Sequence, residues 1–220
     1  MRKANGKEYA VMMMVLASKS PRRREILDEL NIDFEILTEE VDESSDIDDP
    51  SARAQAIAAR KAGAVRDMLV SHNIDVNSLC IVGADTIVWC DGEFMGKPSD
   101  KDDARRMIKL LSGKTHRVYT GIAVAIGGRI ESDVSVSEVD FADLDDEDIE
   151  AYINTDEPYD KAGAYAVQGK AALFIDQIRG DYLGIVGLST RTLDRILRER
   201  FGRKLISMKK RTQTAQRTNP

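Results

Sequence analysis

The chain has the size and composition of an ordinary folded protein and carries a net negative charge. It has 220 residues, of which 42% are hydrophobic and 32% are charged, a balance typical of proteins that fold around an apolar core. The formal net charge is −6, so nucleic acid is not an expected partner. No apolar run reaches the length of a membrane span, so no membrane partner is expected either.

The cysteines and the N-terminal segment indicate the cellular compartment in which the protein is expected. Cys80 lies in an apolar run and is expected to be a buried thiol. It and Cys90 lack clustered histidines and therefore predict no zinc site. The apolar segment 11–17 is too short, and residues 5–8 are too polar, for a signal peptide. The expected compartment is the reducing cytoplasm.

The first half of the chain predicts alternating strands and helices. In chain order, we expect a strand at 11–17, a helix that begins after Ser20, a strand at 34–37, an acidic loop at 39–49, a helix at 51–69 and a strand from 79 to 89. The continuous apolar run at 79–84 is typical of a central strand that is buried on both faces. Asp91 and Gly92 form a hairpin turn motif.

The second half predicts the rest of one α/β domain. We expect a helix at 99–111, strands at 118–126 and 129–141, a helix at 145–154, an ordered loop at 159–169, a strand at 172–178 and a last helix within 184–201. From Arg203 the chain is basic and polar, which predicts a disordered tail. The expected organisation is an N-terminal extension (1–10), one domain (11–202) and the tail (203–220).

The start of the first helix is a candidate anion site. Ser20 is a good N-cap residue, and Pro21 suits the first helical position. Arg22 and Arg23 follow, although cations are disfavoured at the positive end of the helix dipole. A phosphate bound there removes the conflict. The alternative is a surface helix with solvated arginines.

Three further polar residues follow predicted strands or lie in loops. Asp85 comes directly after the apolar run 79–84, at the strand end where open α/β sheets bind ligands. A carboxylate there can bind a divalent metal or accept a proton from water; the alternative is a turn cap. Lys97 can neutralise a phosphate, or it is an ordinary surface lysine. The amide of Gln168 can both donate to and accept from a base edge.

Several common nucleotide and catalytic patterns are missing from the sequence. Neither the Walker A nor the Rossmann glycine pattern is present. No Ser-His-Asp or Cys-His arrangement indicates covalent catalysis.

Five motifs in a fixed order carry a family resemblance. They are Leu16-Ala17-Ser18-x-Ser20-Pro21-Arg22-Arg23, Gly83-Ala84-Asp85-Thr86, Gly96-Lys97-Pro98, Leu111-Ser112-Gly113-Lys114-Thr115-His116 and Asp160-Lys161-Ala162-Gly163-Ala164-Tyr165-x-x-Gln168-Gly169. In combination they resemble the Maf-like nucleoside triphosphate pyrophosphatases. The resemblance extends from about Val15 to about Phe201.

This resemblance implies a fold and a reaction. The fold is a mixed, twisted α/β sheet flanked by helices, elongated and with a central cleft, similar to the inosine triphosphate pyrophosphatases. In the reaction, water attacks between the α- and β-phosphates of a nucleoside triphosphate and gives the monophosphate and pyrophosphate. A divalent cation, Mg²⁺ or Mn²⁺, is the implied cofactor, and a homodimer is a possible assembly.

The resemblance also implies roles for individual residues. Asp85 corresponds to the general base and to a metal ligand. Glu39 or Glu40 is the expected second carboxylate for the metal, and the motifs leave the choice between them open. The residues that match phosphate-binding groups of the family are Ser18, Arg22, Arg23, Lys61 and Lys97.

Three positions indicate the substrate type. Arg22, Thr86 and Gln168 match members that act on dTTP and UTP, whereas members that act on 7-methyl-GTP differ there. Modified pyrimidine nucleotides are expected substrates as well, in a house-cleaning role. Two alternatives stay open: a purine-directed pyrophosphatase, for 7-methyl-GTP or ITP-like substrates, and a non-catalytic regulator of septum formation.

Overall fold

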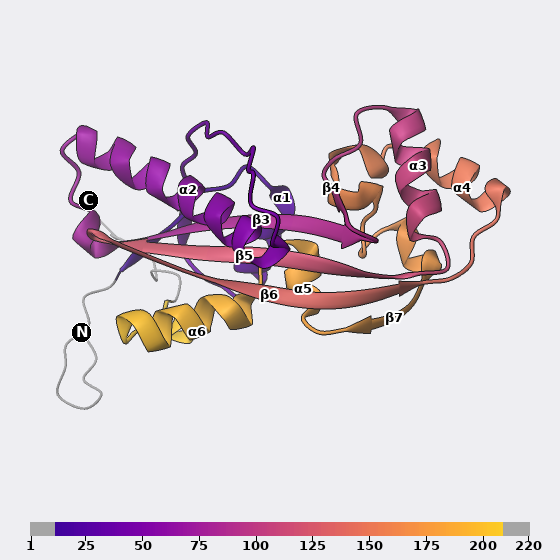
Figure 1. Cartoon of the computed structure of the whole chain (residues 1–220). Coiled ribbons are helices and arrows are strands. Elements are labelled where there is room, and N and C mark those ends of the chain that lie inside the picture. Colours follow the sequence, from indigo (N-terminus) through magenta and orange to yellow (C-terminus); the bar gives the residue numbers. More distant parts are fainter. Residues whose placement is uncertain (1–11, 209–220) are drawn as a thin grey trace, which may run out of the picture.

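The computed structural model describes residues 12–208. Within them, seven strands form one mixed sheet, and helices lie on both of its faces (Figure 1). The strands are β1 (Met13–Leu16), β2 (Phe34–Ile36), β3 (Leu79–Cys90), β4 (Glu93–Met95), β5 (Thr115–Ile126), β6 (Arg129–Phe141) and β7 (Ile175–Arg179). Their order is β2-β1-β3-β5-β6-β7, and β4 pairs with β3. Only β1 makes parallel pairs, with β2 and β3.

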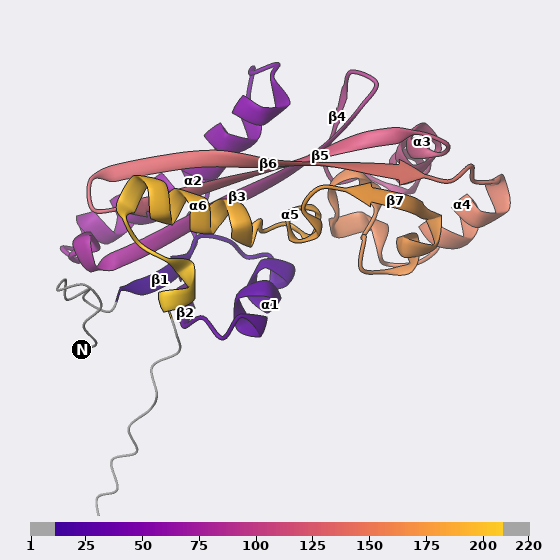
Figure 2. The same ribbon diagram turned by 90° about the horizontal axis from the view of Figure 1, so that it is seen from below.

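Residues 12–208 contain six α-helices and five short 3₁₀ turns. The α-helices are α1 (Pro21–Glu29), α2 (Pro50–Ser71), α3 (Lys101–Leu111), α4 (Asp146–Ile153), α5 (Tyr182–Val186) and α6 (Thr190–Phe201). Short 3₁₀ turns span Val76–Ser78, Pro158–Asp160, Ala162–Ala164, Lys170–Phe174 and Leu205–Ser207. In the views of Figures 1 and 2, α2 lies across one face of the sheet, α5 and α6 lie across the other, and α3 and α4 lie at one end of the elongated molecule. The predicted mixed sheet flanked by helices is confirmed.

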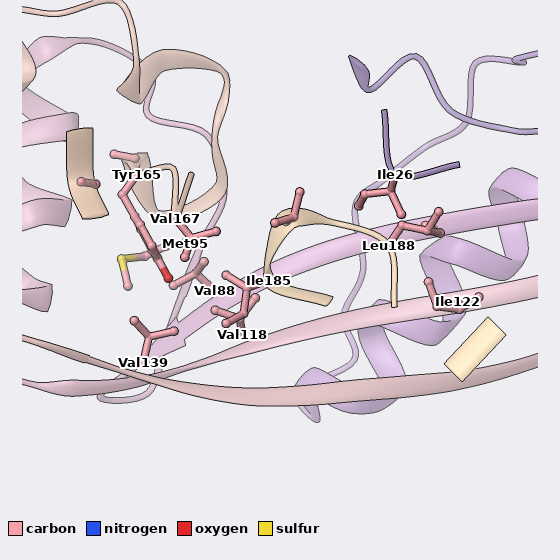
Figure 3. Packing of buried hydrophobic residues seen from close by; sticks show 14 of the residues in the cluster. Ile26, Val88, Met95, Val118, Ile122, Val139, Tyr165, Val167, Ile185 and Leu188 are labelled. Atoms are coloured by element: carbon pink, nitrogen blue, oxygen red, sulfur yellow. The ribbon is translucent and has the colours of Figure 1, made fainter. Parts of the chain in front are cut away.

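Within residues 12–208, buried apolar side chains form a larger core, a second core beside α2 and a small core of Ala54, Ile87 and Tyr119. The first two follow from the alternation of side chains along the strands. In β3, Ile81 packs with Ala58 and Ala62 of α2, whereas Cys80 and Val82 join the larger core on the opposite face. Successive side chains of a strand point to opposite faces, so one buried strand serves both layers. Figure 3 shows part of the larger core.

Two glycines let α2 approach the sheet very closely. A Cβ atom built on Gly83 would lie 2.2 Å from the carbonyl oxygen of Ala58, and one on Gly121 would lie 2.2 Å from that of Ala54. These strand glycines therefore allow the helix backbone to lie directly on β3 and β5. The close approach places the middle of α2 beside the centre of β3.

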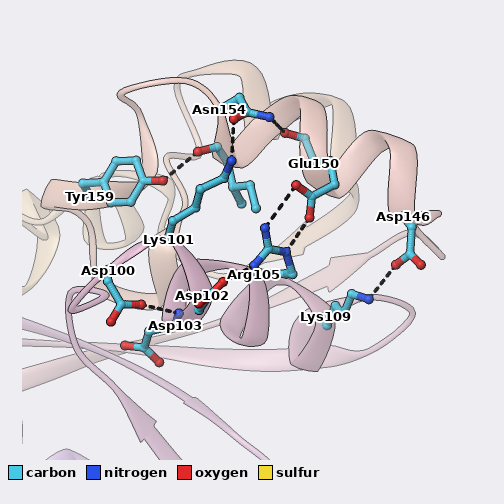
Figure 4. A network of polar contacts seen from close by, with 11 residues as sticks. Asp100, Lys101, Asp102, Asp103, Arg105, Lys109, Asp146, Glu150, Asn154 and Tyr159 are labelled. Atoms are coloured by element: carbon cyan, nitrogen blue, oxygen red, sulfur yellow. Dashed lines mark hydrogen bonds and ion pairs between the residues drawn. The ribbon is translucent and has the colours of Figure 1, made fainter.

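Ion pairs join α3 and α4 at one end of the molecule (Figure 4). Arg105 Nη2 lies 3.1 Å from Glu150 Oε2, and Lys109 Nζ lies 2.6 Å from Asp146 Oδ1. Exposed pairs of this kind contribute little energy individually. Apolar contacts supply the rest: Ile108 of α3 and Ile149 of α4 belong to the larger core.

The structure narrows the bounds of two expected elements. The last helix, expected within 184–201, is α6, and the separate short helix α5 precedes it; Gly187, with φ = 131°, lies between the two in a conformation that side chains rarely adopt. The strand expected at 172–178 begins only at Ile175, after the 3₁₀ turn Lys170–Phe174.

The ordered chain continues beyond residue 202. Leu205 is buried, and its N–H donates a hydrogen bond of 2.9 Å to Asp194 Oδ1 on α6. The prediction of disorder from Arg203 is therefore wrong for residues 203–208, which this contact holds against α6. The rest of the predicted tail, and the N-terminal extension, lie outside the described residues. Within 12–208, no helix is long and apolar enough to cross a membrane.

Candidate functional site

The site lies where one edge of β3 has no neighbouring strand. On that edge, β1 pairs with β3 as far as Val82, and β4 pairs with it from Val88 onward. No described strand pairs with residues 83–87 there. A cavity of about 870 Å³ opens at this gap. The ends of the two neighbouring strands thus create the opening in the sheet.

Asp85 lies in the middle of β3 and not at its end. The strand continues to Cys90, and Asp85 pairs with Gly121 of the antiparallel strand β5. The expectation of a strand end is therefore wrong, because β5 supports β3 along its other edge. The site still lies past the carboxyl end of a parallel strand, but that strand is β1, which stops at Leu16.

The cavity collects every residue that the sequence singled out for the site. Those that line it are Ser18, Arg22, Arg23, Glu39, Glu40, Lys61, Asp85, Thr86, Lys97 and Gln168. They come from six separate stretches of the chain. Val88, Val118 and Ile185 of the larger core add apolar surface to the same cavity (Figure 3).

The charge of the cavity is opposite in sign to that of the chain. Its lining holds seven Lys and Arg residues and five Asp and Glu residues, whereas the whole chain has a net charge of −6. A locally positive recess in a negative protein favours an anionic ligand.

Lys61 of α2 and Asp85 of β3 form an ion pair inside the cavity. Lys61 Nζ lies 2.8 Å from Asp85 Oδ1 and 3.0 Å from Glu43 Oε1. Asp85 is only 8% exposed, whereas the Glu43 side chain is 60% exposed. Glu43 is not among the residues predicted for the site, because the loop 39–49 holds several carboxylates and has no periodicity that distinguishes one from another.

Arg23 of α1 is buried, and each of its three guanidinium nitrogens donates a hydrogen bond. Its Nε–H donates to the carbonyl oxygen of Gly187 (2.7 Å), its Nη1 to Ser18 Oγ (2.9 Å) and its Nη2 to Thr86 Oγ1 (3.3 Å). Burial lowers the pKa of the guanidinium, and the charge of Asp85 opposes this shift. Arg23 therefore fixes the segment before α1 against β3 and α5.

The start of α1 differs in one detail from the expected N-cap. Ser20 occupies the N-cap position and Pro21 follows it, but the Ser20 side chain accepts no hydrogen bond from the helix. Instead, the Ser20 N–H donates to Ser18 Oγ at 3.2 Å. Ser18 thus links this helix start to Arg23.

Arg22 connects the helix start to the segment 160–168. Arg22 Nη1 lies 3.1 Å from Asp160 Oδ2, and Lys161 pairs with the same carboxylate. Burial alone would raise the pKa of Asp160, but the hydrogen bonds from Lys161 and Arg22 outweigh it, so the pKa is lowered. The ion pair joins two walls of the cavity. The segment belongs to one of the five family motifs, but the sequence predicts no individual role for Asp160 or Lys161.

The other predicted site residues are exposed on the cavity lining. Glu39, Glu40, Lys97 and Gln168 all have exposed side chains there. Among residues 12–208, no group of three or more His, Cys, Asp or Glu side chains is arranged to hold a metal ion. Mg²⁺ commonly takes only one or two protein carboxylates together with phosphate oxygens of a substrate. The carboxylates in the cavity therefore fit a cation that arrives with a phosphate ligand.

The fold and the cavity together define an α/β protein with a basic cavity at an opening in its sheet. A family model described as "Maf-like protein" matches residues 13–200. The chain therefore belongs to the Maf-like protein family.

Curated relatives cover most of the chain. A dTTP/UTP pyrophosphatase of Caldanaerobacter subterraneus is 43% identical over 197 residues, which is 89% of this chain and 92% of the relative. One of Bacillus cereus is 41% identical over 187 residues, 84% of this chain and 94% of the relative. Among solved structures, the Ham1 protein of Staphylococcus aureus is similar at 12% identity with a TM-score of 0.45, over 74% of this chain and 90% of that one.

Proposed function

We propose that this protein hydrolyses dTTP and UTP to their monophosphates and pyrophosphate. The observation that carries the proposal is the Asp85–Lys61 pair, which lies inside a cavity lined by basic residues. The names of the curated relatives support the same activity. A triphosphate carries about four negative charges, and the lysines and arginines of the lining, together with a divalent cation, offset them.

Asp85 is the proposed general base. Its carboxylate lines the cavity and accepts a proton from the attacking water. Lys61 is the proposed cation that stabilises charge developing on the phosphate. Its ammonium group lies in the cavity beside the proposed base, 2.8 Å from Asp85 and 3.0 Å from Glu43.

The proposed cofactor is Mg²⁺ or Mn²⁺. Asp85, with Glu43, Glu39 or Glu40 from the acidic loop, would hold it together with phosphate oxygens. Bound there, the cation polarises the phosphoryl group that is attacked.

Selection for uracil and thymine is assigned mainly to Gln168. Its exposed amide can donate to and accept from a pyrimidine edge. Thr86 acts less directly, because its hydroxyl already accepts from Arg23 and lies 3.1 Å from Thr120 Oγ1. We expect modified pyrimidine nucleotides to be accepted through the same contact.

We also propose that the enzyme works in the cytoplasm. Cys80 and Cys90 are both free and buried, as befits a reducing compartment.

A substrate panel tests the proposal. The protein is incubated with dTTP, UTP, dCTP, GTP, ITP and 7-methyl-GTP, with Mg²⁺ or Mn²⁺, and pyrophosphate and orthophosphate are measured separately. We expect pyrophosphate release that is fastest for dTTP and UTP. Faster turnover of a purine nucleotide would contradict the pyrimidine assignment. Release of orthophosphate alone would contradict cleavage between the α- and β-phosphates.

A further inference from the structure

Arg53 of α2 is a cation in the cavity for which neither the motifs nor the reaction described above gives a role. We propose that Arg53, held over the ring of Phe94, binds the pyrophosphate portion of the substrate, which is the β- and γ-phosphates. The proposal rests on the proposed function for the identity of the substrate. Its binding chemistry, an arginine and a pyrophosphate, can be tested without turnover.

The position of Arg53 on α2 aims it at the cavity. Arg53, Ile57 and Lys61 follow one another at intervals of four residues, and all three line the cavity. Residues at this spacing lie on one face of a helix. Arg53 is therefore about two turns, or about 12 Å along the helix axis, from Lys61. Since Lys61 pairs with Asp85, Arg53 lies beyond the reacting centre on the same wall.

The charge of Arg53 is available for a ligand. Within residues 12–208, the Arg53 side chain makes neither a hydrogen bond nor an ion pair, whereas the Arg22 side chain is paired with Asp160. Its guanidinium carbon lies 4.5 Å from the centroid of the Phe94 ring. A cation–π contact of this kind holds the planar group in place while its N–H donors stay unused.

Phe94 and Arg53 both lie on elements next to residues 83–87 of β3, the part of the strand with one unpaired edge. Phe94 lies opposite Trp89 in the β4–β3 pair and packs in the small core with Ile87. Arg53 precedes Ala54, the α2 residue of the same core. A phosphate bound by Arg53 would therefore be held from the α2 and β4 side of the opening.

Phosphate is the better ligand for this side chain than the nucleobase. The guanidinium matches two phosphate oxygens with parallel hydrogen bonds, and its charge adds to each of them. A base carbonyl offers no charge. If Arg53 contacted the base instead, its loss would also weaken binding of a nucleoside monophosphate. Binding of pyrophosphate and binding of a monophosphate therefore distinguish a phosphate contact from a base contact.

Calorimetric titration with inorganic pyrophosphate and, separately, with dTMP tests the proposal in the presence of Mg²⁺. The proteins are the wild type, Arg53→Ala, Arg53→Gln, Phe94→Leu and the control Arg66→Ala. Arg66 is on the same helix, but it pairs with Asp67 and is not part of the cavity lining. We expect both Arg53 variants to bind pyrophosphate about tenfold or more weakly, as for a lost charge-assisted hydrogen bond. Binding of dTMP should stay within about twofold of the wild type.

Of the two remaining variants, Phe94→Leu tests the aromatic contact and Arg66→Ala is the control. Phe94→Leu should weaken pyrophosphate binding less than Arg53→Ala does, because the charge stays but its anchor is lost. Arg66→Ala should bind both ligands as the wild type does. Thermal melts of all variants check that a loss of binding does not reflect a loss of folding, and Arg53→Gln keeps a polar side chain while removing the charge.

Three results would overturn the proposal. They are wild-type affinity for pyrophosphate in the Arg53 variants, an equal loss of dTMP affinity in them, and a wild-type protein that does not bind pyrophosphate. A failure of the proposed function can be told apart from a failure of the Arg53 proposal. If the wild type binds pyrophosphate through Arg53 but releases none from any nucleotide, the Arg53 assignment stands and the activity does not.

Discussion

His116 is a buried residue whose charged form the fold disfavours. It is 1% exposed, its Nε2 lies 2.8 Å from the hydroxyl oxygen of Tyr165, and burial lowers its pKa to about 4. In the unfolded chain the pKa is about 6.5. The unfolded state therefore binds more protons between these values, and stability falls as the pH drops from 6.5 toward 4. The full effect is about 3 kcal/mol.

We predict that His116→Phe removes much of this pH dependence. The phenyl ring preserves the edge-on contacts with Phe141 and Tyr165 but cannot titrate. The measurement is the free energy of unfolding in urea at pH 7 and at pH 4.5. The decrease should be smaller in the variant than in the wild type, although Tyr165 loses a partner at both pH values. Equal decreases would mean that His116 does not become protonated on unfolding in this range.

The individual site residues differ in how far the sequence could predict them. The family resemblance identifies both Lys61 and Asp85, and the two side chains are in contact. Glu43 was not, because its role depends on how the acidic loop folds over α2, and no local pattern encodes that fold. The metal assignment to Asp85 with Glu39 or Glu40 stays a prediction.

At the scale of elements, the contact between α2 and β3 determines whether Lys61 reaches Asp85. We predict that Gly83→Ala destabilises the protein by about 1–3 kcal/mol, the usual cost of overpacking. The new methyl group would collide with the backbone of α2 at Ala58, which no side-chain rotation can relieve. Because α2 must move away, turnover should fall as well, by a larger factor than the loss of folded protein explains.

The matched control for this prediction is Gly128→Ala. Nothing lies within 4 Å of a Cβ atom built at Gly128, its φ is not positive, and it is not part of the cavity lining. Thermal melts and turnover per folded molecule are measured for both variants. A Gly83→Ala protein that melts like the wild type would show that α2 tolerates the added atom and that the close packing is not needed.

The elements themselves were largely predictable, and the exceptions have physical causes. Periodicity placed most helices and strands, because each buries one face or both. The break at Gly187 was not visible in it, since apolar residues continue at helical spacing through Leu188 into α6. The position of Asp85 inside β3 depends on pairing with β5, a contact between distant segments that local pattern does not contain.

At the scale of the whole molecule, charge is unevenly distributed. The chain has a net charge of −6, yet the cavity lining holds more basic than acidic residues. That separation is compatible with a polyanionic substrate and does not favour general binding to nucleic acid. The homodimer implied by the family resemblance stays a prediction.

The central claim is that Asp85 in this cavity drives hydrolysis of dTTP and UTP. Its most direct test is turnover of both nucleotides by Asp85→Asn with Mg²⁺ or Mn²⁺, alongside a thermal melt. The amide preserves size but cannot act as a base. We predict that turnover falls by about two to four orders of magnitude, as for a lost general base, while the melting temperature stays near that of the wild type. Wild-type turnover, or a lowered melting temperature with normal turnover per folded molecule, would contradict the account.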